Sequence, residues 1–303
     1  MSTLVILNPT AGRGKCARLR PRIERGLRDA GVKFDLVETT GPGHALGVAR
    51  DAASHGVTKL ICAGGDGTLH EAANGLLQAP LAEDGATQVA LGCIPAGTGD
   101  DFAKLVNVYR LPPEAAAARM ARATEARFDV GRVDGGEYFD NVLGIGFDAE
   151  VARHALKIRR LKGILVYLAA IYRTFVTFRA PVLEVVSDAH TETSPMMMLG
   201  VMIGVCEGGG FYLTPESDPK DGLFDVCLIR EVGLLQFLRD VPRVMKGTHV
   251  DLPEVSVFKT PRLTIRCADR PLVLELDGEL REPQRREIDV TLEPKRLRVL
   301  VGR

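Results

Sequence analysis

Three glycine-rich turns in the first third of this chain constrain its fold more than any other feature. They lie at residues 8–15, 64–68 and 95–102, and each comes directly after a short apolar run typical of a buried strand. Alternating strands and helices of this length build a parallel sheet with helices on both faces. Turns that follow parallel strands gather at the carboxyl edge of such a sheet. The sequence therefore predicts an α/β domain with three loops at one edge.

The pattern of the chain changes near residue 125. Before it, strands are predicted at residues 4–7, 34–38, 59–63 and 88–93, with helices at 16–30, 44–54, 68–77, 100–106 and 113–123. After it, strand-like runs dominate, at residues 128–133, 138–143, 182–186, 196–205, 224–229, 262–266, 272–276, 288–292 and 297–301. Thr68 and Glu71 have the spacing of a capping box. We therefore expect an α/β domain at residues 1–125 and a β-rich sandwich at 126–303, with the last strand free to return to the first domain.

The three turns carry residues suited to holding phosphate. Glycine lets backbone N–H groups approach phosphate oxygens, and the helix N-terminus that follows favours negative charge. Asp66 in the second turn and Asp101 in the third would supply hard oxygen ligands for a magnesium ion. One such turn alone is as often only a tight bend. Three on one sheet edge indicate a nucleotide site.

Several segments of the chain resemble those of a known protein family. The segments NPTAG, GGDGTLHEAANGL, IPAGTGDDFA, DGLFDV and LDGE are together similar to the diacylglycerol kinase catalytic-domain family, which includes bacterial lipid kinases and the sphingosine and ceramide kinases. The resemblance covers residues 4–301. It implies an NAD-kinase-like, Rossmann-like α/β domain that binds nucleotide and a β-rich sandwich that receives a lipid. It also implies an ATP-dependent transfer of phosphate to a lipid hydroxyl, with diacylglycerol favoured as substrate.

The resemblance also assigns site residues, with ATP and Mg²⁺ as the implied cofactors. Those implied to bind ATP are Asn8, Pro9, Thr10, Ala11, Gly12, Thr39, Gly65, Asp66, Gly67, Thr68, Leu69, His70, Glu71, Thr98 and Asp101. Asp100 stands where the family usually has asparagine, and its role stays open. Asp218, Asp221 and the carbonyl of Leu223 resemble a magnesium loop of several bacterial members, although a solvated acidic turn fits the same residues.

Residues 274–279, LELDGE, are the candidate for accepting the substrate proton. Phosphoryl transfer to an alcohol needs a carboxylate near the attacking hydroxyl. The residues alone favour an ordinary hairpin, because Asp-Gly is a strong turn signal. By similarity to the family, Glu279 becomes the general base and Asp277 a supporting group, with Asp66 as the third catalytic residue.

The amino-acid composition restricts the binding partners and the cellular location that we expect for this protein. Lys plus Arg and Asp plus Glu number 39 each, which argues against a nucleic-acid binder. Six scattered cysteines favour a reduced, cytoplasmic setting, and no run of about 20 apolar residues predicts a membrane span. Residues 151–180 carry seven basic and no acidic residues, which suits transient contact with an anionic membrane or a core helix with a solvated end.

Two rival functions stay open from the sequence. The GGDGT segment is shared with NAD kinases, and a nucleotide-gated lipid-binding protein without catalysis would need the same loops. The lipid itself is also open, among diacylglycerol, phosphatidylglycerol, a sphingoid base and a polyprenol-like alcohol. Monomer and homodimer are not distinguished.

Overall fold

The computed structural model describes residues 2–147, 149–151, 173–175, 177–282 and 285–303. The predicted basic stretch at residues 151–180 lies mostly outside these described residues, so its membrane role stays a prediction. No helix within the described ranges is long and apolar enough to cross a bilayer.

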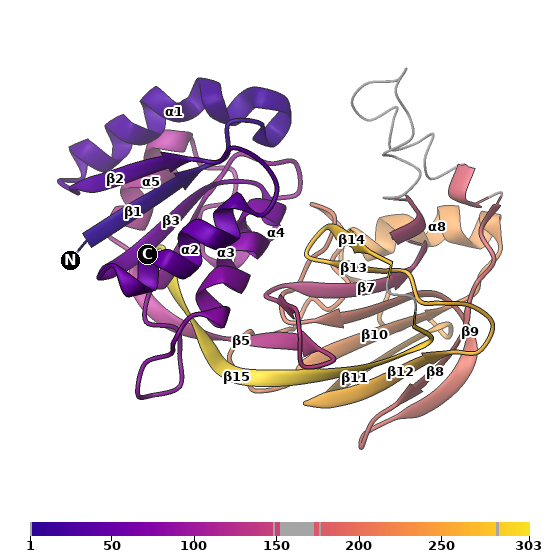
Figure 1. Ribbon diagram of the computed structural model, residues 1–303. Coiled ribbons are helices and arrows are strands. Elements are labelled where there is room, and N and C mark those ends of the chain that lie inside the picture. The colour runs from indigo at the N-terminus through magenta and orange to yellow at the C-terminus, as the bar shows by residue number, and fades with distance from the viewer. Residues whose placement is uncertain (1, 148, 152–172, 176, 283–284) are drawn as a thin grey trace.

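The N-terminal half is a parallel sheet between two layers of helices (Figure 1). Its elements are β1 (Ser2–Leu7), α1 (Ala11–Asp29), β2 (Phe34–Glu38), α2 (His44–Ser54), β3 (Val57–Gly64), α3 (Asp66–Gln78), β4 (Ala90–Pro95), α4 (Asp101–Leu105) and α5 (Pro113–Ala121). The strands lie in the order β2-β1-β3-β4, with α1 packed against α5 and α2 against α3. The strands are rich in Val, Ile and Leu because both faces of this sheet are covered by helices. The predicted α/β architecture is confirmed.

The C-terminal half is built mainly of antiparallel strands. Its elements are β5 (Thr124–Val133), β6 (Tyr138–Phe139), β7 (Val142–Gly146), β8 (Val182–Val186), β9 (Thr191–Met202), β10 (Phe224–Arg230), α8 (Leu234–Val244), β11 (Val255–Thr260), β12 (Arg262–Cys267), β13 (Leu274–Leu276), β14 (Glu279–Arg281) and β15 (Glu287–Val301). The pairs β7–β9, β8–β9, β8–β12 and β9–β10 are all antiparallel. A second buried apolar cluster fills this half, so the predicted β-rich C-terminal part is also confirmed.

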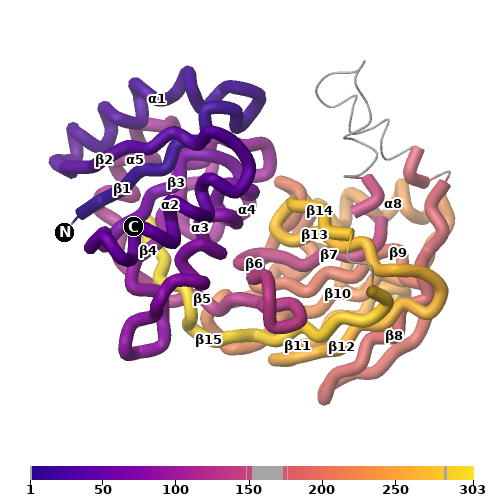
Figure 2. Tube along the Cα trace, viewed as in Figure 1, coloured from indigo at the N-terminus to yellow at the C-terminus, as the bar shows by residue number. Residues whose placement is uncertain are grey.

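Strand β15 joins the two halves. Its first part pairs with β12 in the C-terminal half, and its last part pairs in parallel with β4, where Val299 lies beside Leu91. Strand β5 runs antiparallel to it from Val290 to Val301. Figure 2 shows this yellow strand passing from one half into the other. The division at residue 125 stays a prediction, because β5 and β15 extend along both halves.

Three local predictions are wrong, and some elements were not predicted. Helix α3 begins at Asp66, with Gly65 as its N-cap and no side-chain cap, so the capping box does not form. Glu71 instead accepts the N–H groups of Gly43 (2.8 Å) and Ala45 (3.1 Å) at the start of α2. The predicted strands at 288–292 and 297–301 are one strand, the run at 138–143 is split into β6 and β7, and α8 and β11 were not predicted.

Candidate active site

The three glycine-rich loops meet at the carboxyl edge of the parallel sheet. Asn8 Nδ2 donates to Thr68 Oγ1 at 2.9 Å, which links the first loop to α3. A Cβ placed on Gly12 would lie 2.3 Å from the carbonyl oxygen of Ala96, and one on Gly97 would lie 2.6 Å from Gly65 Cα. Glycine is therefore required where these loops pack backbone against backbone.

The first loop has an unusual run of backbone conformations. Gly12, Arg13 and Gly14 have φ angles of 57°, 59° and 79°, all in the left-handed region. Asn8 Oδ1 accepts from the N–H (3.1 Å) and the hydroxyl (2.8 Å) of Thr10, which fixes the start of the loop. Successive N–H groups in such turns form concave sites for anions. Together with the N-terminus of α3, this loop is suited to hold phosphate oxygens.

A group of carboxylates lies beside these loops. Asp66 Oδ1 accepts the N–H groups of Asp101 (2.8 Å) and Phe102 (3.3 Å), and so caps the short helix α4. Asp101 accepts the N–H of Gly209 at 3.0 Å and forms an ion pair with Lys104. Burial, followed by repulsion from Asp101 and Asp100, raises the pKa of Asp66 to about 7. A divalent cation would relieve this repulsion, so Asp66 and Asp101 fit a metal that is also bound by nucleotide phosphates.

The β13–β14 hairpin brings a carboxylate to the same edge. Its turn residues Asp277 and Gly278 have φ angles of 50° and 89°, as a tight hairpin turn requires. Glu279, the first residue of β14, is exposed to the cleft. A Cβ placed on Gly67 would lie 2.2 Å from Glu279 Oε1. The carboxylate of Glu279 therefore lies directly against the first turn of α3.

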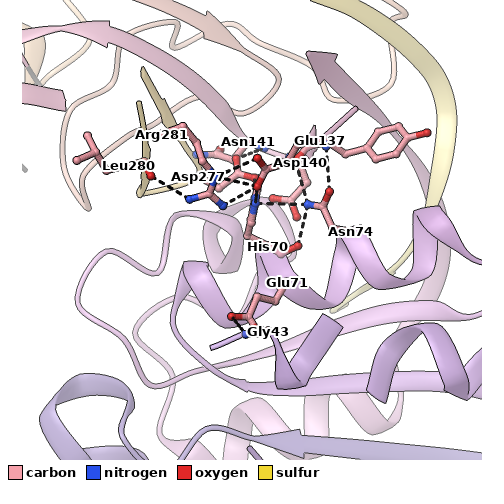
Figure 3. Close-up of polar contacts among 11 residues, drawn as sticks. Gly43, His70, Glu71, Asn74, Glu137, Asp140, Asn141, Asp277, Leu280 and Arg281 are labelled. Atoms are coloured by element: carbon pink, nitrogen blue, oxygen red, sulfur yellow. Dashed lines mark hydrogen bonds and ion pairs between the residues drawn. The ribbon is translucent and has the colours of Figure 1, made fainter. Parts of the chain in front are cut away.

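Asp277 is held in a fixed position by the backbone around it. Its buried carboxylate accepts the N–H groups of Asp140 (3.0 Å), Asn141 (2.9 Å) and Val142 (2.9 Å). It also lies 2.8 Å from His70 Nδ1. Both oxygens are thereby used, and the side chain points toward His70 of α3 (Figure 3).

His70 lies buried between two carboxylates from the C-terminal half. Its Nε2 is 2.9 Å from Glu137 Oε1, and Glu137 also accepts from Arg281 Nε at 2.9 Å. Burial alone lowers the pKa of His70, but the hydrogen bonds to Asp277 and Glu137 outweigh it and raise the pKa to about 10. At Glu137, burial raises the pKa, but the hydrogen bonds from His70 and Arg281 outweigh it and lower the pKa to about 2. His70, Asp277, Glu137 and Arg281, called the histidine clamp below, therefore tie α3 to the other half by charged hydrogen bonds.

These elements enclose a polar cleft of about 690 Å³ between the two halves. It is lined by Asn8, Thr10, Ala11, Gly12, Thr39, Thr40, Gly41, Pro42, Ala45, Gly65, Asp66, Gly67, Thr68, Glu71, Gly97, Thr98, Gly99, Asp101, Phe102, Asp140, Asn141, Val142, Glu207, Gly208, Glu275, Asp277, Gly278 and Glu279. The three glycine-rich loops and the carboxylates of the β13–β14 hairpin thus line one common space.

Comparison with known proteins identifies the relatives of this chain. The model of the diacylglycerol kinase catalytic domain matches residues 2–133, and that of the YegS C-terminal NAD kinase beta sandwich-like domain matches residues 141–301. A protein of Xanthomonas oryzae pv. oryzae named probable lipid kinase YegS-like is 31% identical over 90% of this chain and 88% of its own. This chain belongs to the family of diacylglycerol kinases and YegS-like lipid kinases.

A further relative and two solved structures match nearly the whole chain. The diacylglycerol kinase of Bacillus subtilis (strain 168) is 29% identical over 91% of this chain and 88% of its own. A diacylglycerol kinase crystal structure from Bacillus anthracis has the same fold, with a TM-score of 0.74 at 21% identity over 99% of this chain and 97% of its own. An NAD kinase from Archaeoglobus fulgidus in complex with ATP has a TM-score of 0.54 at 12% identity over 100% of this chain and 94% of its own. As a family member, this chain is a kinase.

Most residues assigned to ATP in the sequence line the cleft of this kinase. Three do not: Pro9, Leu69 and His70 lie outside the lining. Leu69 is buried in the apolar core of the N-terminal half, and His70 belongs to the histidine clamp. Asp100 has a φ of 53° and accepts the N–H of Gly97 at 2.9 Å, so it shapes the third loop.

The predicted magnesium loop contains a lysine contact. Lys259 Nζ lies 2.6 Å from Asp221 and 3.3 Å from Asp225. Asp218 accepts the N–H of Lys220 at 3.1 Å, and Asp221 accepts that of Leu223 at 3.0 Å. The described residues include no group of three His, Cys, Asp or Glu side chains arranged to hold a metal. Lys259 supplies a positive charge at this loop, and a metal ion there stays a prediction.

Sequence reasoning missed several residues of the site. Asp140 lines the cleft with its Oδ2 buried and unpartnered among the described residues. Burial and the nearby Asp277 raise the pKa of Asp140 well above its usual range. Glu137 and Arg281 complete the histidine clamp but lie in a turn and at the end of a three-residue strand. Of these residues, Asp140 had a recognisable sequence signal, because the polar pair Asp140-Asn141 directly precedes the apolar run of β7.

Replacing Gly67 by Ala should lower kcat about 100-fold. The new Cβ would lie 2.2 Å from Glu279 Oε1 and force this carboxylate to move, and displacement of a reacting group by about 1 Å costs roughly this factor. Steady-state kinetics would measure the effect. The matched control is Gly47→Ala on α2, where an added Cβ meets nothing within 4 Å. An unchanged kcat in the Gly67 variant would show that catalysis does not depend on the position of Glu279.

Proposed function

We propose that this kinase transfers the γ-phosphoryl group of ATP, with Mg²⁺, to the free hydroxyl of diacylglycerol and so forms phosphatidic acid. One observation carries the proposal. The polar cleft adjoins a second pocket of about 310 Å³, and Glu207, Gly208, Glu275 and Gly278 line both. A substrate with a polar head and an apolar body would therefore have a place for each end.

The second pocket is lined mainly by apolar side chains. They include Phe147, Met197, Met198, Phe211, Leu213 and Phe237. The rings of Phe147 and Phe237 lie 5.1 Å apart and close one side. Apolar walls of this kind favour acyl chains over the charged groups of a dinucleotide, because burying unpaired charge is costly. This pocket supports a lipid rather than NAD as the phosphate acceptor.

The residues around the junction have separable roles in the transfer. The lipid hydroxyl oxygen forms a bond to the γ-phosphorus as the bond to the oxygen bridging the β- and γ-phosphates breaks, and ADP leaves. Glu279, which borders the cleft beside the hairpin turn, takes the hydroxyl proton. Asp277 positions the hairpin through its backbone contacts. Asp66 and Asp101 would hold Mg²⁺, which neutralises phosphate charge when bound.

The test is phosphate transfer from radiolabelled ATP, with magnesium, to a panel of lipids in mixed micelles. We expect labelled phosphatidic acid from diacylglycerol, and less product from phosphatidylglycerol, a sphingoid base or a polyprenol. A faster reaction with another lipid would replace diacylglycerol as the substrate. NADP formed from NAD would instead assign the NAD kinase function. ATP-dependent liposome binding without release of ADP would assign a non-catalytic lipid-binding protein.

A further inference from the structure

An exposed apolar ridge runs along helix α8. It consists of Leu234, Leu235, Leu238 and Met245, whose exposed fractions are 42%, 84%, 57% and 51%. Four of the six exposed large apolar side chains in the described ranges are therefore gathered on this one helix and its C-cap. Contiguous apolar surface of this kind marks a site of contact with a protein or a membrane.

The other side of α8 forms a wall of the apolar pocket. Phe237, Val241 and Val244 are spaced at i, i+4 and i+7, and all three line the pocket. Leu234, Leu238 and Met245 follow on the adjoining stripe of the helix. The apolar surface of α8 is therefore continuous from the pocket to the exposed ridge. Whatever covers the ridge lies next to the pocket that we assign to the lipid.

The charges of this helix are arranged on its remaining side. From Leu234 to Lys246 there are three basic residues and one acidic residue. At 100° per residue, Arg239 lies beside Leu235 at the border of the ridge, and Lys246 directly follows the C-cap of the helix. The acidic residue, Asp240, lines the pocket and accepts two hydrogen bonds from Arg239 at 2.9 Å. With three basic residues and one acidic residue, this segment keeps a net positive charge beside the ridge.

We propose that α8 docks in the interfacial layer of an anionic bilayer, with the ridge among the upper acyl chains and Arg239 and Lys246 among the headgroups. A wide apolar arc bordered by basic residues is the pattern of helices that lie in this layer. The inference rests on the proposed function, since docking brings the lipid pocket to the surface in which diacylglycerol resides. The positive charge beside the ridge and the continuity with the pocket favour a bilayer over a second protein.

The test compares the double variant Leu235→Gln/Leu238→Gln with wild type. Binding to vesicles of phosphatidylcholine with about a quarter phosphatidylglycerol is measured by sedimentation. We expect the variant to bind at least about tenfold more weakly. We expect its kcat on a monomerically dispersed short-chain diacylglycerol to stay within about twofold of wild type, because the variant leaves the cleft intact. Val257→Gln on β11 is the matched control, since Val257 is 40% exposed but lies off α8.

A second variant, Arg239→Gln/Lys246→Gln, tests this positive charge. It should lose affinity for these vesicles, retain wild-type affinity for pure phosphatidylcholine, and bind with a weaker salt dependence. Unchanged vesicle binding in the leucine variant, with an unchanged thermal unfolding midpoint, would overturn the proposal. If wild type is a dimer that dissociates in the leucine variant while vesicle binding persists, the ridge binds a second copy of the chain. That outcome would also overturn the proposal. Vesicle binding without phosphorylation of any lipid by wild type would instead overturn the proposed function.

Discussion

Replacing Glu279 by Gln is expected to lower kcat by a factor of about 100 to 10,000. The amide has nearly the same shape but cannot take up the hydroxyl proton, and general base catalysis contributes a factor in this range. Binding of ATP should persist, because the amide fills nearly the same space as the carboxylate and leaves the glycine-rich loops that line the cleft unchanged. The single-turnover rate of lipid phosphorylation and the Kd for ATP measure the two properties separately.

The control for this variant is Glu216→Gln. Glu216 is exposed and lies outside the cleft, so its loss should leave kcat unchanged. A Glu279 variant with wild-type kcat would remove this residue from proton transfer. A loss of ATP affinity equal to the loss of kcat would show that Glu279 holds the nucleotide rather than the proton.

Replacing His70 by Leu is expected to destabilise the fold by about 3 kcal/mol. Removing one partner of a buried ion pair leaves the others uncompensated, at a cost of about 3–5 kcal/mol. The lower end applies because Asp277 retains three backbone N–H contacts and Glu137 retains Arg281. Urea unfolding of both proteins measures the difference. His55→Leu, on the exposed end of α2, should change stability by less than about 0.5 kcal/mol.

The loss of unfolding free energy in the His70 variant should depend on pH. The folded pKa of His70 is raised from 6.5 to about 10, so its stabilisation is full below pH 6.5 and is lost as the pH rises through 10. The folded pKa of Glu137 is lowered from 4.5 to about 2, so its part is full above pH 4.5 and is lost as the pH falls through 2. The difference between the two proteins should therefore be largest between pH 4.5 and 6.5. A deficit that does not change up to pH 10 would mean that His70 is not charged in the clamp.

The glycine-rich side of the cleft could be predicted from the sequence, because it depends on residues that are close together in the chain. Each of the first two glycine-rich turns joins a buried strand to a helix within a few residues, so chain direction alone brings the turns to one edge. The hairpin at Asp277 was also predictable, since Asp-Gly permits the two positive φ angles that it requires. Its opposition to Gly67 was not, because the two are about 200 residues apart and no periodicity relates them.

The histidine clamp shows what limits such reasoning. His70 lies in a motif that suggested phosphate binding, yet its ring points to the far half of the protein (Figure 3). Its partners Glu137, Asp277 and Arg281 lie in a loop and a hairpin that are far from α3 in the sequence. Helix α8 is a different case. Its polar residues, which lie on one side at helical spacing, are Gln236, Arg239, Asp240 and Arg243. The sequence therefore carried a helix signal that was missed among the strand-like runs around it.

The path of β15 has a consequence for how the chain folds during its synthesis. The N-terminal half is made first, but the edge of its sheet beside β4 is covered only by residues 297–301. A nascent chain that ends before these residues presents an unpaired strand edge and an incomplete core, both of which favour misassembly. The hairpin that carries Glu279 also comes late in this sequence, so a nascent chain that ends before it lacks one wall of the cleft. Closing the cleft and covering the β4 edge therefore both depend on residues 277–301, far from the loops that they complete.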